Sequence, residues 1–366
     1  MNKKMITLCP LLLSYPEISF AGESTEPLSA ELVVEWQNEN RLSSDDSTVD
    51  ETNNSFFRAE LAPVLRLSSN IFIDGVLVFE PFAQAAAKNI GDDIWFESNG
   101  LFAEEIKINF EYGNYTFWGG KFNPSFGTAW DYGRGIWSED FAEDYEITEK
   151  LGVGGSYDFV TKNFGNHTFS ASSFFADTTF LSGSTVTKRA RTSLKDGGAS
   201  NTEDFSSFTI SLDGENLMGI EDLKYHMAYR FLGEQDKNRS GTADDETGFA
   251  AMLNYGMALD EDLSVDILGE YASLYNFEGV KNSDRNYYSA SIVTTIYDNW
   301  NITAGYTLRD IKNDGSGGKF DDYLFQLSAG YDFQNGLTAE TGWRVTEESN
   351  VDTDVIGFLI RYTKEF

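Results

Sequence analysis

The chain has little of what most enzymes and metal proteins use. Among its 366 residues are one cysteine, two histidines and six prolines. Cys9 lies within the first 21 residues, so the rest of the chain can form no disulfide and use no thiol nucleophile. His167 and His226 lie in separate segments with no catalytic-triad signature, and there is no HExxH, CxxC or phosphate-binding glycine loop. These absences argue against an enzyme and predict no cofactor and no metal.

A long apolar run is also missing. A transmembrane helix needs about 18 or more consecutive apolar residues, and the chain has no such segment. The first 21 residues instead resemble a secretory signal, with Lys3 and Lys4, a short apolar stretch at 5–13, and a small-x-small cleavage site at 19–21. We therefore expect a signal peptide over 1–21 and a single exported domain over 22–366.

Positive charge is scarce. The chain has 59 acidic and 27 basic side chains, for a formal net charge of −32. Such a field repels nucleic acid and favours cations. High charge can also indicate disorder, but an aromatic content of 15% argues for a folded chain.

What is abundant is alternation with a period of two. Apolar and polar residues alternate in runs of roughly ten residues, the pattern of strands with two different faces. Sixteen strand-like segments are predicted, at 29–40, 55–67, 70–84, 101–112, 115–121, 151–160, 167–181, 204–213, 222–232, 247–259, 262–275, 286–297, 300–310, 320–333, 337–347 and 353–366. An even count is expected of bacterial single-chain barrels. Fourteen or eighteen strands also fit, because 70–84 and 167–181 are long.

The connections alternate between short and long. Tight links such as Gly113-Asn114 and Asp298-Asn299 alternate with longer polar or acidic segments such as 85–100 and 122–150. This is the short-turn, long-loop plan of transmembrane antiparallel β-barrels, with the long side facing outward. A soluble β-sandwich is the alternative, but it gives no reason for one end to carry the longer connections.

Aromatic residues and prolines refine this prediction. Rings near predicted strand ends favour a membrane–water boundary; they are Tyr112, Phe159, Trp300, Phe333 and Phe366. Pro63 and Pro81 fall inside predicted strands, where each must lie at a bulge or near a rim.

The last segment alternates Phe358, Ile360 and Tyr362 with polar or small residues and closes on Phe366. This resembles the C-terminal strand that Gram-negative outer-membrane proteins present to their barrel-assembly machinery. A core strand that merely ends the chain is the alternative.

The longest connection, 122–150, is the third of the long loops. In this rank, and in the stretch 120–127 leading into Trp130-Asp131, the chain resembles the sixteen-stranded general porins of Gram-negative bacteria. The resemblance implies a third outer loop folded into the barrel, a homotrimer, and an outer-membrane location among lipid and lipopolysaccharide. It rests on architecture across the mature chain more than on any single motif.

Charged side chains are the candidate pore residues. The loop acids predicted to form a negative constriction are Asp131, Glu139, Asp140, Glu143, Asp144 and Glu146, and acidic clusters favour cations in a narrow pore. The alternation points five arginines into the lumen: Arg58, Arg66, Arg230, Arg344 and Arg361. The resemblance implies that this basic wall faces the loop acids across the pore. Two alternatives give these charges no role in the pore: the acidic loop is solvated outside the barrel, or the arginines are paired with wall acids such as Glu60 and Glu340.

The predicted function is therefore passive diffusion of small hydrophilic solutes and ions, with a preference for cations. Two alternatives stay open. One is a channel selective for a sugar or an organic cation, with Trp130, Tyr132, Trp137 and Tyr145 stacking on the solute. The other is a plugged structural or adhesive surface barrel. Glycines at 119, 120, 152, 154 and 155 either make room for the folded loop or form a flat patch for a neighbouring subunit.

Overall fold

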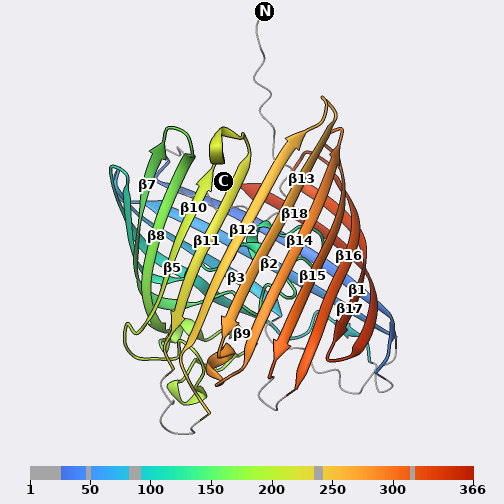
Figure 1. Cartoon of the computed structure of the whole chain (residues 1–366), viewed down its shortest axis with the longest axis horizontal. Coiled ribbons are helices and arrows are strands. Elements are labelled where there is room, and N and C mark those ends of the chain that lie inside the picture. The colour runs from blue at the N-terminus through green and yellow to red at the C-terminus, as the bar shows by residue number, and fades with distance from the viewer. Residues whose placement is uncertain (1–25, 47–50, 82–91, 235–241, 314–317) are drawn as a thin grey trace, which may run out of the picture.

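A computed structural model describes residues 26–46, 51–81, 92–234, 242–313 and 318–366. The predicted signal peptide lies outside these ranges. Within them the chain forms one antiparallel sheet that closes on itself into a barrel with strongly tilted strands (Figure 1). Across the described ranges, no helix has the length and apolar character that crossing a bilayer requires.

Sixteen strands make up the barrel wall. They are β1 (Leu28–Ser44), β2 (Thr52–Arg66), β3 (Ile71–Pro81), β5 (Asn99–Tyr112), β6 (Tyr115–Phe122), β7 (Lys150–Thr161), β8 (Gly165–Ala176), β10 (Ser207–Glu215), β11 (Leu223–Leu232), β12 (Glu246–Ala258), β13 (Leu263–Tyr275), β14 (Asp284–Ile296), β15 (Trp300–Lys312), β16 (Lys319–Asp332), β17 (Leu337–Glu348) and β18 (Val351–Glu365). Each pairs with its neighbour in chain order, and β1 pairs with β18 from Glu31↔Glu365 to Ser44↔Thr353. The predicted sixteen-stranded barrel is confirmed, with strand ends displaced by a few residues.

The connections contain the remaining elements. Two short strands lie outside the main wall: β4 (Ile94–Trp95) pairs with β2, and β9 (Thr185–Val186) pairs with β5. The one α-helix in the described ranges is α1 (Ala129–Tyr132), and the 3₁₀ turns are η1 (Phe180–Ser182), η2 (Leu194–Asp196), η3 (Leu217–Gly219) and η4 (Phe277–Gly279).

Short and long connections lie at opposite ends of the barrel. The tight β5–β6, β12–β13 and β14–β15 turns share one end, at the top of Figure 1, and the longer connections lie at the other. The β17–β18 link, residues 349–350, is the exception, because it is a tight turn at the long-loop end. The predicted asymmetry is otherwise present.

The two faces of the wall differ as the alternation predicts. Outward-facing Phe249, Leu253 and Trp343 are exposed, whereas inward-facing Asn254 and Glu340 are buried. The apolar side chains thus form the outer surface and many polar ones face the lumen, the arrangement of a barrel surrounded by lipid.

Aromatic residues mark the short-turn end. Tyr112, Trp300, Phe333 and Phe366 are between 49% and 70% exposed there. Phe159, on the same end of β7, is half-buried and packs against His167, with ring centroids 5.0 Å apart. A belt of rings at one rim is typical of a membrane–water boundary.

The two prolines are placed where a missing donor is tolerated. Pro63 pairs with Ala30 of β1, but its other side coincides with a gap in the β2–β3 ladder between Leu61 and Val64. Pro81 is the last residue of β3, at the long-loop rim. Proline has no backbone N–H, and at neither position does the sheet require that donor.

Candidate functional site: the lumen and its inward loop

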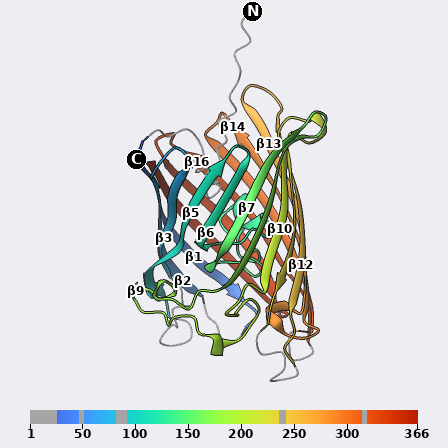
Figure 2. The same ribbon diagram turned by 90° about the vertical axis from the view of Figure 1, so that its left-hand side faces the viewer.

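The loop between β6 and β7, residues 123–149, is called the inward loop here. It packs against the inner faces of β13, β14, β16 and β1, so it lies inside the barrel, as Figure 2 also shows. The resemblance to the general porins implied that the third long loop lies inside the barrel. The contacts of the inward loop with the wall explain why it remains docked there.

Glycines make room where the loop leaves the wall. A Cβ on Gly154 would lie 2.4 Å from the Trp118 ring, and a Cβ on Gly152 would lie 2.3 Å from the Ser173 carbonyl oxygen. Trp118 in turn packs edge-on against Phe122, with ring centroids 6.2 Å apart. For Gly152 and Gly154, the structure therefore favours close internal packing over a flat patch for a second subunit.

Glu270 anchors both ends of the loop. Its buried carboxylate, on β13, accepts hydrogen bonds from the Thr128 backbone N–H (2.6 Å), the Thr128 hydroxyl (2.7 Å) and the Ala129 N–H (3.1 Å). It also accepts one from the Tyr145 hydroxyl (2.6 Å), seventeen residues later in the loop. Hydrogen bonds to a charged acceptor are about twice as strong as neutral ones, so this one side chain ties the loop to the wall.

The loop's middle is held in a similar way. The Gln326 amide accepts from the Trp137 N–H (3.0 Å) and donates to the Arg134 carbonyl (3.0 Å), while Trp137 Nε1 donates to Glu39 (2.6 Å). Gly342 and Gly357 lie beneath the indole, and a Cβ on Gly357 would come within 2.3 Å of it. The wall thus has a slot for this ring.

Acidic side chains of the loop contact wall arginines directly. Asp140 is ion-paired with Arg344, and Glu139 lies 3.6 Å from Arg58. The resemblance implied that these charges face each other across an open pore. The structure differs, because this part of the loop docks on the basic wall and its carboxylates partly neutralise it.

Asp144 is the best-connected loop acid. It accepts hydrogen bonds from Arg285 (3.1 Å), Arg309 (2.9 Å) and the Tyr287 hydroxyl (2.7 Å). Arg309 also pairs with Asp322 at 2.6 Å. Sequence reasoning missed Arg285 and Arg309, although both stand at inward positions of their strands and the alternation could have found them.

The remaining loop acids are less engaged. Asp131 and Glu143 are exposed and Glu146 is half-buried, and neither Glu143 nor Glu146 forms an ion pair within the described ranges. Although the Glu143 side chain is open to the lumen, the surrounding wall and loop desolvate it, and this effect, followed by the Asp140 charge, raises its pKa to about 7. Desolvation likewise raises the pKa of Glu139 to about 8, although the Arg58 charge opposes this rise. Desolvation also raises the pKa of Glu146 well above its usual value.

The other three predicted arginines have separate surroundings. Arg361 pairs with Glu35 beside the Arg58 and Arg344 wall. Arg230, on β11, pairs with Glu246 and donates to the Tyr145 carbonyl (2.5 Å), so it is part of the loop anchor. Arg66 lies over the Phe72 ring (5.3 Å) near the short-turn end, away from the loop.

Of the four rings considered for solute stacking, two are not available. Trp137 is 1% and Tyr145 2% exposed, because both are anchors of the loop, so stacking on a solute is contradicted for this pair. Trp130 and Tyr132 are half-buried. The Lys224 ammonium lies 5.6 Å from the centroid of the Tyr132 ring.

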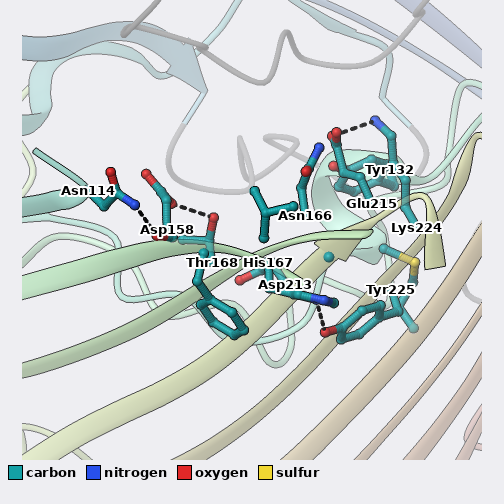
Figure 3. Close-up of a pocket in the computed structure, with 14 residues that line it drawn as sticks. Asn114, Tyr132, Asp158, Asn166, His167, Thr168, Asp213, Glu215, Lys224 and Tyr225 are labelled. Atoms are coloured by element: carbon teal, nitrogen blue, oxygen red, sulfur yellow. Dashed lines mark hydrogen bonds and ion pairs between the residues drawn. The ribbon is translucent and has the colours of Figure 1, made fainter. Parts of the chain in front are cut away.

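A cavity of about 620 Å³ lies next to Tyr132, toward the short-turn end (Figure 3). Its lining comes mainly from the inner faces of β7, β8, β10 and β11, with Asp158, Thr168, Asp213 and Lys224 among its polar groups. No group of three or more His, Cys, Asp or Glu side chains within the described ranges is arranged to hold a metal ion.

Comparison with known proteins supports the fold alone. No family model matches the sequence, and no curated protein matches it either. Solved structures do resemble it. OprB of Pseudomonas putida has a TM-score of 0.64 at 12% identity, over 92% of this chain and 94% of that one. OmpF of Salmonella typhi, in complex with daunomycin, has a TM-score of 0.61 at 12% identity, over 92% and 97%. The outer membrane channel DcaP of Acinetobacter baumannii has a TM-score of 0.56 at 10% identity, over 92% and 97%.

The fold is that of the Gram-negative outer-membrane porins. At these identities the porin fold is shared without a recognisable common sequence, so the loop contacts above are properties of this chain. An OpdK structure from Pseudomonas aeruginosa with a TM-score of 0.55 at 10% identity, over 93% of this chain and 99% of that one, holds vanillate.

Proposed function

We propose that the chain is an outer-membrane channel through which small hydrophilic solutes and ions diffuse passively, with a preference for cations. The observation that carries the proposal is the closed sixteen-stranded wall with an apolar outer face, a polar inner face and an anchored loop inside it. Such a wall suits lipid on one side and water on the other. The porin fold supports the location in the outer membrane of a Gram-negative bacterium.

The sign of the selectivity follows from which charges are left uncompensated. Arg344 and Arg309 each contact a loop carboxylate, and Arg58 pairs with Glu80 of the wall at 3.1 Å, which cancels much of their field. Glu143 has no ion-pair partner within the described ranges, so its charge is uncompensated above its pKa of about 7. Charges a few ångströms from the permeation path matter by about 1–4 kcal/mol, enough to bias passage several-fold.

The reversal potential in a salt gradient across a planar bilayer tests this sign. We expect a potential of cation-selective sign from the full chain, and an anion-selective one would refute the preference. Deleting residues 128–146, the segment anchored by Glu270 and Gln326, should raise single-channel conductance. An unchanged conductance would show that the loop is not the constriction.

The assembly partners are part of the same proposal. Phe366 is 65% exposed at the short-turn end, and its N–H donates to the Ala30 carbonyl (2.9 Å), so it completes the seam between β18 and β1. We propose that this strand is presented to the barrel-assembly machinery and that the barrel assembles as a homotrimer among lipopolysaccharide. Heat-modifiable gel mobility of the membrane-extracted protein, before and after cross-linking, tests the barrel and its subunit number.

One observation favours a substrate-selective channel as the second candidate. The luminal cavity beside Tyr132 combines an aromatic ring with carboxylates and amides, which is more than a featureless water column requires. Concentration-dependent, saturable block of ionic current by a solute would favour it over general diffusion.

A further inference from the structure

The register of β7, β8, β10 and β11 places polar side chains in one row along the cavity. Asp158 pairs with Thr168, Thr168 with Asp213, and Asp213 with His226. Neighbouring strands lie about 4.8 Å apart, so Asp158 and Asp213 are separated by roughly 10 Å along the wall. Figure 3 shows both carboxylates at the edge of the same cavity.

Neither carboxylate of this row has a lysine or an arginine as its partner. Asp158 accepts from the Thr168 hydroxyl (2.7 Å), and Asp213 accepts from the Ser211 hydroxyl (3.2 Å) and lies 2.6 Å from His226 Nδ1. Within the described ranges, no lysine or arginine contacts either of them. The one lysine of the lining, Lys224, lies 3.8 Å from Glu215. The cavity is therefore negative where the row lies.

The rest of the lining suits a hydroxylated ring. Tyr132 contributes an aromatic surface from the end of α1, and Lys224 over that ring shows that it already attracts a cation. Asn166 is exposed in the cavity, so its amide is free to donate to and accept from solute hydroxyls. The volume of about 620 Å³ lies within the 300–1,000 Å³ typical of small-molecule sites.

We infer that this cavity is a solute-binding subsite for a hydroxylated ring that carries a primary ammonium group, the chemistry of an amino sugar. The ammonium binds at the Asp158–Asp213 row, the ring lies against Tyr132, and Asn166 and Thr168 contact the hydroxyl groups. The inference rests on the proposed channel function, because it places the subsite on the path of the permeating solute.

Ligand-observed NMR titration of the full chain in detergent tests binding without requiring conduction. The probes are D-glucosamine, N-acetyl-D-glucosamine, which keeps the ring and loses the charge, and ethanolamine, which keeps the charge and loses the ring. We expect D-glucosamine to bind about tenfold more tightly than either control, the factor that one lost charge-assisted contact carries. Equal binding of N-acetyl-D-glucosamine, or of ethanolamine, would overturn the assignment.

Variants localise the effect. Asp158→Asn and Asp213→Asn should each weaken D-glucosamine binding about tenfold. Asp158→Asn is the safer of the two, because Asp158 is exposed and its carboxylate accepts a hydrogen bond only from Thr168, whereas the Asp213 carboxylate also contacts His226. Asp321→Asn removes the same charge from an exposed position at the long-loop end and should leave binding unchanged. Unaltered affinity in both cavity variants would refute the site.

Bilayer recordings on the same preparations separate the two proposals. Conductance steps without D-glucosamine binding would refute the subsite and leave the channel standing. Binding without conductance steps would refute the channel and leave only the site. Heat-modifiable mobility of every variant confirms that its barrel has formed.

Discussion

Replacing Glu270 with alanine should loosen the inward loop without unfolding the barrel. Glu270 is 5% exposed and accepts four hydrogen bonds, from Thr128, Ala129 and Tyr145. Its loss leaves two backbone N–H groups and two hydroxyls to find other acceptors, and each buried donor left unsatisfied costs about 1–3 kcal/mol. Water in the lumen reaches some of them, so we expect the docked loop to be weakened by about 3 kcal/mol, or roughly 150-fold in its docking equilibrium.

The other contacts of the loop determine how the loss of the Glu270 carboxylate affects conductance. Gln326, the Trp137 slot and the Asp144 cluster still hold the loop. A single-channel recording of Glu270→Ala should therefore show brief excursions to a higher conductance above the parent level, rather than one permanently larger pore. Glu261→Ala, an exposed glutamate in the β12–β13 turn, is the matched control and should record like the parent. Noise and conductance identical to the parent in Glu270→Ala would refute the idea that this carboxylate anchors the loop.

Three further predictions concern the lumen and its wall. Desolvation raises the pKa of Glu143 to about 7, so that carboxyl is charged above this pH and neutral below it. Cation selectivity, measured by reversal potential, should therefore fall as the pH is lowered from about 8 to about 6. Glu143→Gln should flatten that dependence. Arg344→Gln removes the partner of Asp140 and should increase cation selectivity, whereas Lys312→Gln, 62% exposed at the long-loop end, should change it little; a shift toward anions would contradict the pairing. Gly154→Ala drives a Cβ into the Trp118 ring and should destabilise the barrel by about 1–3 kcal/mol, lowering the temperature at which its gel mobility changes, while Gly269→Ala, with nothing within 4 Å, should not.

The docked loop changes how the lumen charges should be interpreted. The resemblance implied that the loop acids and the wall arginines face each other across the pore as two opposed walls. The structure brings Asp140 and Asp144 into contact with Arg344, Arg285 and Arg309, so these charges hold the loop as well as shape the field. A variant of one of these residues therefore alters loop docking and selectivity together, and the two readouts need to be measured side by side.

The sequence by itself determined the barrel. A period of two over some ten residues leaves each strand with one apolar and one polar face, and sixteen such strands can satisfy their backbone groups and cover the apolar faces by closing in lipid. The turn residues and the alternation of short and long connections then set the order of the strands and the two ends of the barrel. These are local properties, and they can be predicted from neighbouring residues in the chain.

The tertiary structure alone decided which side chains meet inside. Trp137 and Tyr145 resemble exposed binding rings in the sequence, but they are buried because Gly342, Gly357 and Glu270, far along the chain, provide a slot and an acceptor for them. Likewise, Asp158 and Asp213 border one cavity only because β8 lies between β7 and β10 in this register. Contacts between a loop and a distant wall depend on strand tilt and stagger, which the alternation of residues along a single strand does not encode.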